Sequence, residues 1–82
     1  MKYRKKPPVV IEAERFWPQI KPWPAGVIEI WPNAFIINTI EGELNVTAGD
    51  WIITGIKGER YPCKSDVFWA TYEPAWDDDR AT

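Results

Sequence analysis

The sequence predicts an α+β fold: a small twisted antiparallel sheet, built as a meander of hairpins, with a short C-terminal helix. Short apolar stretches of strand length alternate with turns that contain glycine or proline along most of the 82-residue chain. Only after residue 64 does the spacing of apolar residues become helical. A chain of this length supplies one hydrophobic core. We therefore expect a single domain over residues 1–76 and an acidic C-terminal tail over residues 77–82.

The first expected strand covers residues 9–16. Its side chains alternate in character, with Ile11 and Ala13 facing one side and Glu12 and Glu14 the other. This period of two is typical of a strand with one buried and one solvated face. The two glutamates are therefore interpreted as part of a solvated face rather than as a catalytic carboxylate pair.

A proline-rich loop is expected over residues 17–26. Three prolines and a glycine in this segment disfavour both a helix interior and a central strand. The loop carries Trp17 and Trp23, and the chain has six tryptophans, more than so small a core readily hides. We expect a homo-oligomer, a dimer or higher, with this loop as its interface. A short strand over residues 27–31 follows.

The first hairpin is expected between residues 35–40 and 44–47. Gly42 lies in the connecting turn, where glycine readily supplies a positive φ. The alternation beyond the turn directs Leu44 and Val46 inward.

The second hairpin begins with an almost continuous apolar run over residues 51–56. Such a run is typical of a buried central strand. Lys57 and Gly58 form the expected turn, and residues 59–63 form the returning strand.

The terminal helix is expected over residues 67–72. Ser65 or Asp66 precedes it as a candidate N-cap, and Pro74 is expected to stop it. No internal repeat is evident.

Composition excludes several classes of chemistry. The absence of histidine removes Ser-His-Asp and Cys-His arrangements and HExxH zinc sites. A single cysteine, Cys63, excludes an internal disulfide and a CxxC motif. Arg60 and Lys64 stand close to Cys63 in sequence and would lower its pKa, but a buried, unreactive cysteine is the stronger interpretation. We expect no catalytic residue, no metal, no cofactor and no enzymatic activity.

Charge and hydropathy indicate the compartment and disfavour two partners. Net charge is −2 and the isoelectric point is near 5.0, which disfavours nucleic acid. No apolar run has the length of a signal sequence or a membrane span. We therefore expect a cytoplasmic protein. Residues 2–6 carry four cations and Asp77–Asp79 three anions. Both ends are either solvated or, for the basic arm, placed against a phosphate or an acidic patch.

The residues that best suit ligand binding lie around the second hairpin. Cations next to aromatic faces suit phosphates and bases, through charge-assisted hydrogen bonds and stacking. The candidate ligand-binding residues are Arg4, Lys5, Lys6, Trp51, Lys57, Arg60, Tyr61 and Lys64. In this interpretation Arg60 holds a phosphate, Tyr61 or Trp51 stacks on a base, and the basic arm closes over the ligand. The alternative is that Trp51 and Tyr61 belong to the core and that the cations are only surface side chains of the hairpin.

Several fragments at both ends of the chain carry a family resemblance. They are Tyr3–Pro7 (YRKKP), Val9–Ala13 (VVIEA), Glu41–Gly42, Gly49–Gly55 (GDWIITG), Gly58–Glu59, Tyr61–Lys64 (YPCK) and Thr71–Pro74 (TYEP). Together they resemble a family of small phage and prophage proteins that read YRKKPVVIEA near the start and GDWIIxGxxGExYPCKxDxF…TYE near the end. This chain departs from that pattern at Pro8 and Ser65.

The resemblance implies a role in the encounter between a phage and its bacterial host. We expect a non-enzymatic counter-defence protein, a sponge that sequesters a nucleotide signal of the cyclic-dinucleotide kind in the infected cell. The alternative is a protein-interaction module that blocks a host factor or serves in the virion. An enzyme or a nucleic-acid binder is the least favoured class.

Overall fold

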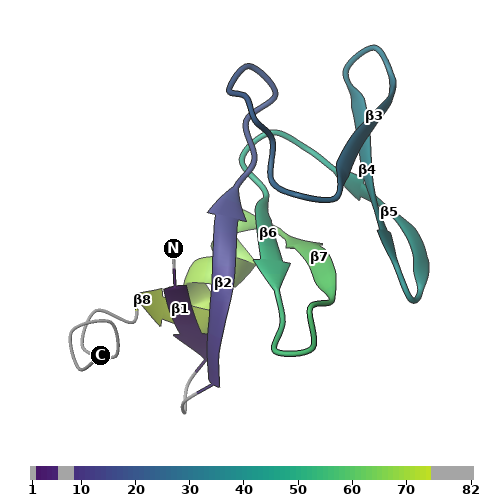
Figure 1. Ribbon diagram of the computed structural model, residues 1–82. Helices are drawn as coiled ribbons and strands as arrows, with labels where there is room; N and C mark the ends of the chain where they lie inside the picture. The colour runs from purple at the N-terminus through teal and green to yellow at the C-terminus, as the bar shows by residue number, and fades with distance from the viewer. Residues whose placement is uncertain (1, 6–8, 75–82) are drawn as a thin grey trace.

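The computed structural model describes residues 2–5 and 9–74, and of Arg4, Lys5 and Val9 only the backbone. This part of the chain forms eight strands and one helix (Figure 1). In chain order they are β1 Lys2–Lys5, β2 Val9–Arg15, β3 Val27–Trp31, β4 Ala34–Thr39, β5 Gly42–Val46, β6 Trp51–Thr54, β7 Arg60–Cys63, α1 Ser65–Thr71 and β8 Tyr72–Pro74. Within the described ranges, no helix combines the length and apolar character needed to cross a membrane.

The strands form two antiparallel sheets, and the predicted antiparallel class with one short helix is confirmed. One sheet has the order β7-β6-β2-β1-β8 and the other the order β3-β4-β5. The sequence predicted a single sheet, and the structure differs because β6 pairs with β2 rather than with β5. Two backbone hydrogen bonds extend that pairing: Phe16 N–H donates to Asp50 O at 2.7 Å, and Gly49 N–H donates to Phe16 O at 2.8 Å.

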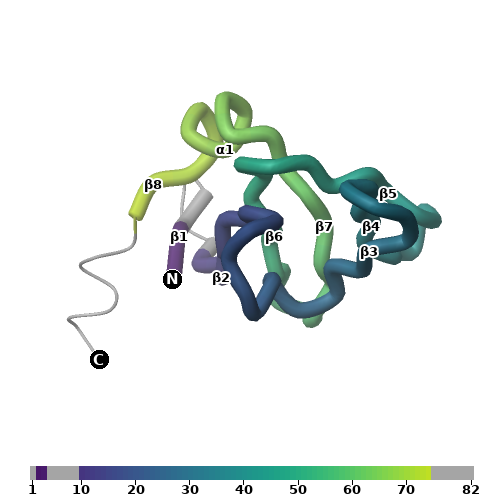
Figure 2. The backbone as a smooth tube through the Cα atoms, turned by 90° about the horizontal axis from the view of Figure 1, so that it is seen from above, coloured from purple at the N-terminus to yellow at the C-terminus, as the bar shows by residue number. Residues whose placement is uncertain are grey.

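The five-stranded sheet is organised around the β2–β6 pair, in which Ala13 lies opposite Ile53. Ile11 and Ala13 are buried while Glu12 and Glu14 are exposed, so the predicted alternation of β2 is confirmed. Helix α1 covers the buried face (Figure 2). The core between them comprises Tyr3, Ile11, Ala13, Trp51, Ile53, Phe68 and Tyr72.

Strands β1 and β8 were not predicted. The backbone of residues 2–5 lies between β2 and β8 instead of forming a separate arm. Tyr3 explains the placement, because its buried ring packs edge-on against Trp51 at 5.2 Å and Phe68 at 4.8 Å between centroids. At the other end of the chain the helix ends at Thr71, before the proline expected to stop it. Tyr72 is already extended, and it starts β8.

The three-stranded sheet lies beside β7, which both views of the backbone show (Figures 1 and 2). A second core joins it to the end of β2 and to β6, and this core comprises Phe16, Phe35, Ile37, Val46 and Ile52. Val46 is buried as predicted, but Leu44 on the same strand is exposed. Ile56, predicted to be core, is also exposed because β6 ends at Thr54 and the chain turns away from the sheet.

Candidate functional site

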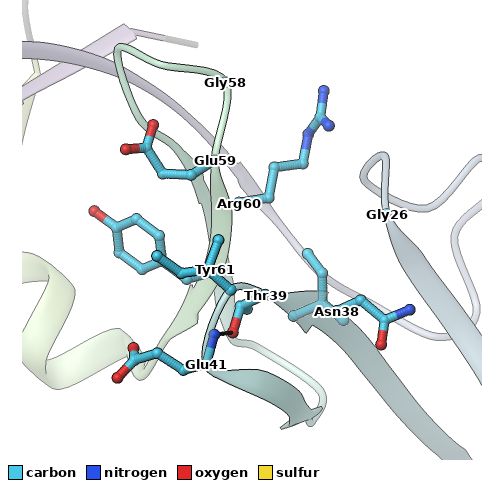
Figure 3. Close-up of a pocket in the computed structure, with 10 residues that line it drawn as sticks. Gly26, Asn38, Thr39, Glu41, Gly58, Glu59, Arg60 and Tyr61 are labelled. Carbon is cyan, nitrogen blue, oxygen red and sulfur yellow. Dashed lines mark hydrogen bonds between the residues drawn. The ribbon is translucent and has the colours of Figure 1, made fainter.

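A hollow lies between β7 and the β4–β5 hairpin (Figure 3). Its volume is about 520 Å³, and small-molecule sites span about 300–1,000 Å³. Its walls are formed by Gly26, Ile37, Asn38, Thr39, Ile40, Glu41, Gly58, Glu59, Arg60 and Tyr61. Apart from Gly26, the walls are two continuous runs, residues 37–41 and 58–61, so the hollow follows the edge of β7 rather than one of its faces.

The backbone of β7 turns a free edge toward this hollow. Gly55 N–H donates to Glu59 O at 2.8 Å, so residue 59 has its backbone groups directed at β6. In an antiparallel pair the direction alternates with each residue, and the N–H and C=O of Arg60 therefore point away from β6. Among the described residues neither group of Arg60 has a hydrogen-bonding partner. The hollow thus receives an unpaired donor and an unpaired acceptor.

The side chains of β7 alternate between the two sides of the hollow. Arg60 extends to the side of β7 on which Gly26 lies, whereas the ring of Tyr61 extends to the opposite side (Figure 3). The Arg60 guanidinium has no ion-pair or hydrogen-bonding partner in the described part of the chain. It also lines a second hollow, of about 70 Å³, together with Glu12 and Glu14.

Two carboxylates lie on the Tyr61 side. Glu59 Oε1 accepts a hydrogen bond from Lys57 N–H at 2.9 Å, which holds the carboxylate against the β6–β7 turn. The backbone of Glu41 is held by its N–H, which donates to Thr39 Oγ1 at 3.1 Å, and its carboxylate lies on the same side as the ring of Tyr61 (Figure 3). The hollow is therefore cationic on one side and anionic on the other.

Trp51 is a core residue, so its predicted stacking on a ligand is corrected. Its side chain is only 6% exposed. One face stacks on Phe68, with centroids 4.2 Å apart and planes 6° from parallel, and the Arg15 guanidinium lies 5.7 Å from the ring centroid. No face of the indole is accessible to a base.

Lys64 was predicted to bind a ligand, but its side chain makes contacts within the protein instead. Its ammonium lies 3.1 Å from Asp50 Oδ1 and 3.2 Å from Oδ2, and donates to Thr47 Oγ1 at 2.8 Å. These contacts satisfy a buried carboxylate. The cation is therefore engaged, at the end of β7 far from the turn that borders the hollow.

Tyr61 lines the hollow and also packs against the first core. Burial and a hydrogen bond with the Tyr72 side chain raise the pKa of Tyr61. Lys57 lies exposed in the turn before β7 and outside the hollow's walls. The predicted pairing of Arg60 with a neighbouring stacking ring is not seen, because adjacent strand residues face opposite ways.

Of the predicted ligand-binding residues in the basic arm, the structure describes only the backbone of residues 4 and 5. The backbone of Arg4 and Lys5 lies in β1, separated from β7 by β2 and β6. Lys6 lies outside the described residues, as do the acidic residues 77–82. Of the predicted residues whose side chains the structure describes, only Arg60 and Tyr61 line the hollow. Gly26, Asn38, Glu41 and Glu59 were not predicted, since no local pattern marks residues that meet across two sheets.

The two tryptophans of the proline-rich loop are partly engaged within the chain. Trp23 packs edge-on against Phe16 and Phe35, and its Nε1–H donates to Pro18 O at 3.0 Å. Trp17 is half-buried, with the Arg15 guanidinium 4.9 Å from its ring. The largest exposed apolar side chains lie elsewhere. They include Ile28, Ile30 and Trp31 on the edge strand β3.

Cys63 is half-buried, and burial is the main cause that raises the pKa of its thiol, with contributions from Asp50 and Asp66. The nearby cations therefore do not activate it. In the described part of the chain, no three side chains of His, Cys, Asp or Glu are arranged to hold a metal ion.

Comparison with known proteins identifies no relative of this chain. No family model, curated protein or solved structure matches the chain. The resemblance to phage proteins stays a prediction from the motifs.

Proposed function

We propose that the protein is a non-enzymatic interaction module that takes an extended segment of a partner protein into the hollow beside β7. The observation that carries the proposal is the free backbone edge of Arg60 inside a hollow of about 520 Å³. An exposed sheet edge recruits a further strand through its main-chain groups, a common mode of peptide recognition. Blocking a host factor or assembling into a virion are both uses of such a module.

The pattern of free groups on β7 defines how such a strand would pair. Arg60 offers an N–H and a C=O, and two residues further Pro62 offers only a C=O, because proline has no N–H. A strand in the hollow would therefore form a complete pair of hydrogen bonds opposite Arg60, whereas Pro62 lies outside the walls of the hollow. Pro62 limits the free edge, which also protects β7 from unselective pairing with other chains.

Apolar side chains at the base and rim add an affinity that does not depend on backbone pairing. Ile37 is buried at the base, and Ile40 at the rim is almost fully exposed. A partner segment that covers Ile40 would gain about 25 cal/mol for each Å² of apolar surface removed from water.

The test uses selected peptides and two variants of one residue. A display library of random octapeptides is selected against the purified protein, and binders are measured by calorimetry and by the amide spectrum. Arg60→Ala keeps the backbone N–H, whereas Arg60→Pro removes it while leaving the β6 pairing of this position intact. One backbone hydrogen bond contributes about 0.5–1.5 kcal/mol, so Arg60→Pro should bind about 2- to 12-fold more weakly than Arg60→Ala.

The expected result is a family of peptides that shift the Arg60 amide and lose affinity in Arg60→Pro. Peptides that bind both variants equally, or that leave the Arg60 amide unchanged, would overturn strand addition at β7. Retained circular dichroism of both variants is the control for folding.

A nucleotide sponge is the second candidate, and the unpartnered Arg60 guanidinium in a ligand-sized hollow is the observation that favours it. The other cations named for this role lie elsewhere, so one phosphate contact remains where several were expected. Calorimetry with a panel of cyclic dinucleotides on wild type and Arg60→Ala tests it. Binding below millimolar Kd that drops about tenfold or more in the variant supports the sponge. Absence of binding removes it.

Self-association and a cytoplasmic location in an infected bacterium belong to the same proposal. We place the self-association surface on β3, where Trp31 is 74% exposed and Ile28 and Ile30 are exposed on the same strand. Exposed apolar patches of this kind commonly mark interfaces. Sedimentation of wild type and Trp31→Ser at tens of micromolar tests it: wild type should exceed the 9.5 kDa of the single chain and the variant should return to it. A monomeric wild type contradicts this part of the proposal.

A further inference from the structure

We infer that the segment bound beside β7 alternates in charge, with an acidic residue opposite Arg60 and a basic residue next to it. The inference rests on the proposed function and specifies the chemistry of the partner. It comes from the opposite charges on the two sides of the hollow, which Figure 3 shows: Arg60 on one side, and Glu41 and Glu59 on the other.

The stereochemistry of strand pairing assigns each side chain of the segment to one side of the hollow. The residue directly opposite Arg60 shares its face, because paired residues in a sheet point the same way. That residue meets the guanidinium. Its two neighbours in the segment point to the face of Tyr61, where Glu59 and Glu41 lie (Figure 3). An acid at the first position and a base at either neighbour are therefore complementary.

Each of these charges is available to a partner. The Arg60 guanidinium and the Glu41 carboxylate have no hydrogen-bonding or ion-pair partner among the described residues, and Glu59 accepts only the backbone N–H of Lys57. An anionic ligand such as a polyphosphate would meet Arg60 but be repelled by both glutamates. A segment that carries both signs in adjacent positions satisfies all three groups.

The expected effect of each charge pair is modest because these side chains are exposed. Opposite charges across a strand pair contribute about 0.2–1 kcal/mol, which corresponds to about 1.4- to 5-fold in Kd. The preference should weaken with added salt, since exposed charges are screened over about 8 Å at physiological ionic strength.

The probes are four peptides of one length that differ only in charge. They are acetyl-Thr-Lys-Glu-Lys-Thr-amide and its versions with Gln in place of both Lys, of Glu, or of all three. Titration is followed through the amide spectrum, in which the Arg60 N–H reports strand pairing. The peptide with both signs should bind most tightly, the two peptides that keep one sign about 1.4- to 5-fold more weakly per lost pair, and the neutral peptide least.

A variant of the protein tests whether the lysines of the peptide lie next to Glu41. Glu41→Gln should reduce the advantage of the Lys-Glu-Lys peptide over the Gln-Glu-Gln peptide. Glu43→Gln removes the same charge from the neighbouring strand β5, outside the walls of the hollow, and should leave the advantage unchanged.

The two possible failures are distinguishable. If all four peptides shift the Arg60 amide with equal Kd, the charge rule is overturned and strand addition stands. If peptides selected from the library also leave that amide unshifted, strand addition itself is overturned. If Glu43→Gln lowers the preference as much as Glu41→Gln, the effect is one of net charge and the assignment to the hollow is overturned.

Discussion

The Lys64 ammonium lies 3.1 Å from Asp50 Oδ1, and the two side chains differ sharply in burial: Lys64 is 61% exposed and Asp50 is 4% exposed. Asp50 Oδ2 also accepts the Thr47 N–H at 2.9 Å. The pair therefore closes the turn that leads from β5 into β6 and links it to the end of β7. This ion pair explains why the Lys64 ammonium contributes to the fold and is not available to a ligand.

Replacing Lys64 should cost stability without affecting binding. In Lys64→Met the buried Asp50 carboxylate keeps only its neutral donors, and we expect unfolding to become easier by about 1–2 kcal/mol, a range that allows for the exposure of the ammonium. Lys57→Met, in the next turn, removes an exposed cation and should change stability by less than about 0.5 kcal/mol. Urea denaturation measures both. Equal stability of the two variants would mean that the ion pair contributes nothing.

Phe68 should be the most costly residue of α1 to truncate. It is fully buried and contacts Tyr3, Trp51 and Tyr72, so Phe68→Ala should destabilise the protein by about 3–5 kcal/mol. Trp69 is a matched control on the same helix, because it is also aromatic but 49% exposed. We expect Trp69→Ala to cost less than half as much in thermal or urea unfolding. The reverse order would contradict the placement of α1 on the sheet.

Gly26 should tolerate a side chain less well than Gly42. Both have a positive φ, +94° and +109°, so alanine at either position is strained by about 1–3 kcal/mol. At Gly26 the added Cβ would also lie 3.2 Å from Ile37 Cδ1, whereas nothing lies within 4 Å of it at Gly42. Gly26→Ala should therefore be the less stable variant and should bind selected peptides more weakly. Equal effects on unfolding would show that Ile37 moves aside freely.

Alkaline pH should reveal the raised pKa of Cys63. Burial favours the neutral thiol in the folded state, so its contribution to stability is complete below the ordinary pKa of 9.0 and is lost as pH rises above that value. Between pH 8 and 10 the wild type should lose more stability than Cys63→Ser, which has no thiol. Alkylation at pH 8 should also be several-fold slower in the folded than in the urea-unfolded protein. Equal pH slopes would contradict a buried thiol.

Local pattern was sufficient for most of the strands. The alternation at Ile11 and Ala13 predicted the buried face of β2, and Gly42 and Gly58 predicted the two hairpin turns, each with a positive φ in the structure. These features depend on residues that are neighbours in sequence. The short helix after residue 64 follows the same rule, since it depends on the spacing of residues one turn apart.

Pairing between distant segments could not be predicted in the same way. β1 carries three charges in four residues, a composition that disfavours a central strand, yet it pairs with β2 and buries the ring of Tyr3 in the core. β8 follows the helix without a turn signal and exists because β1 offers it an edge. Whether β1 and β8 form therefore depends on the strands with which they pair, and these are distant in the sequence.

The sequence by itself determined the antiparallel character of the fold and the positions of its hairpin turns. It also contained the information that Arg60 and Tyr61, as neighbours on a strand, face opposite ways. Only the tertiary structure decided which cations remain available, by burying Asp50 beside Lys64, and where the free edge of β7 meets the β4–β5 hairpin. The reason is physical: periodicity acts between residues a few positions apart, whereas a hollow is made by segments whose contact depends on the packing of the whole chain.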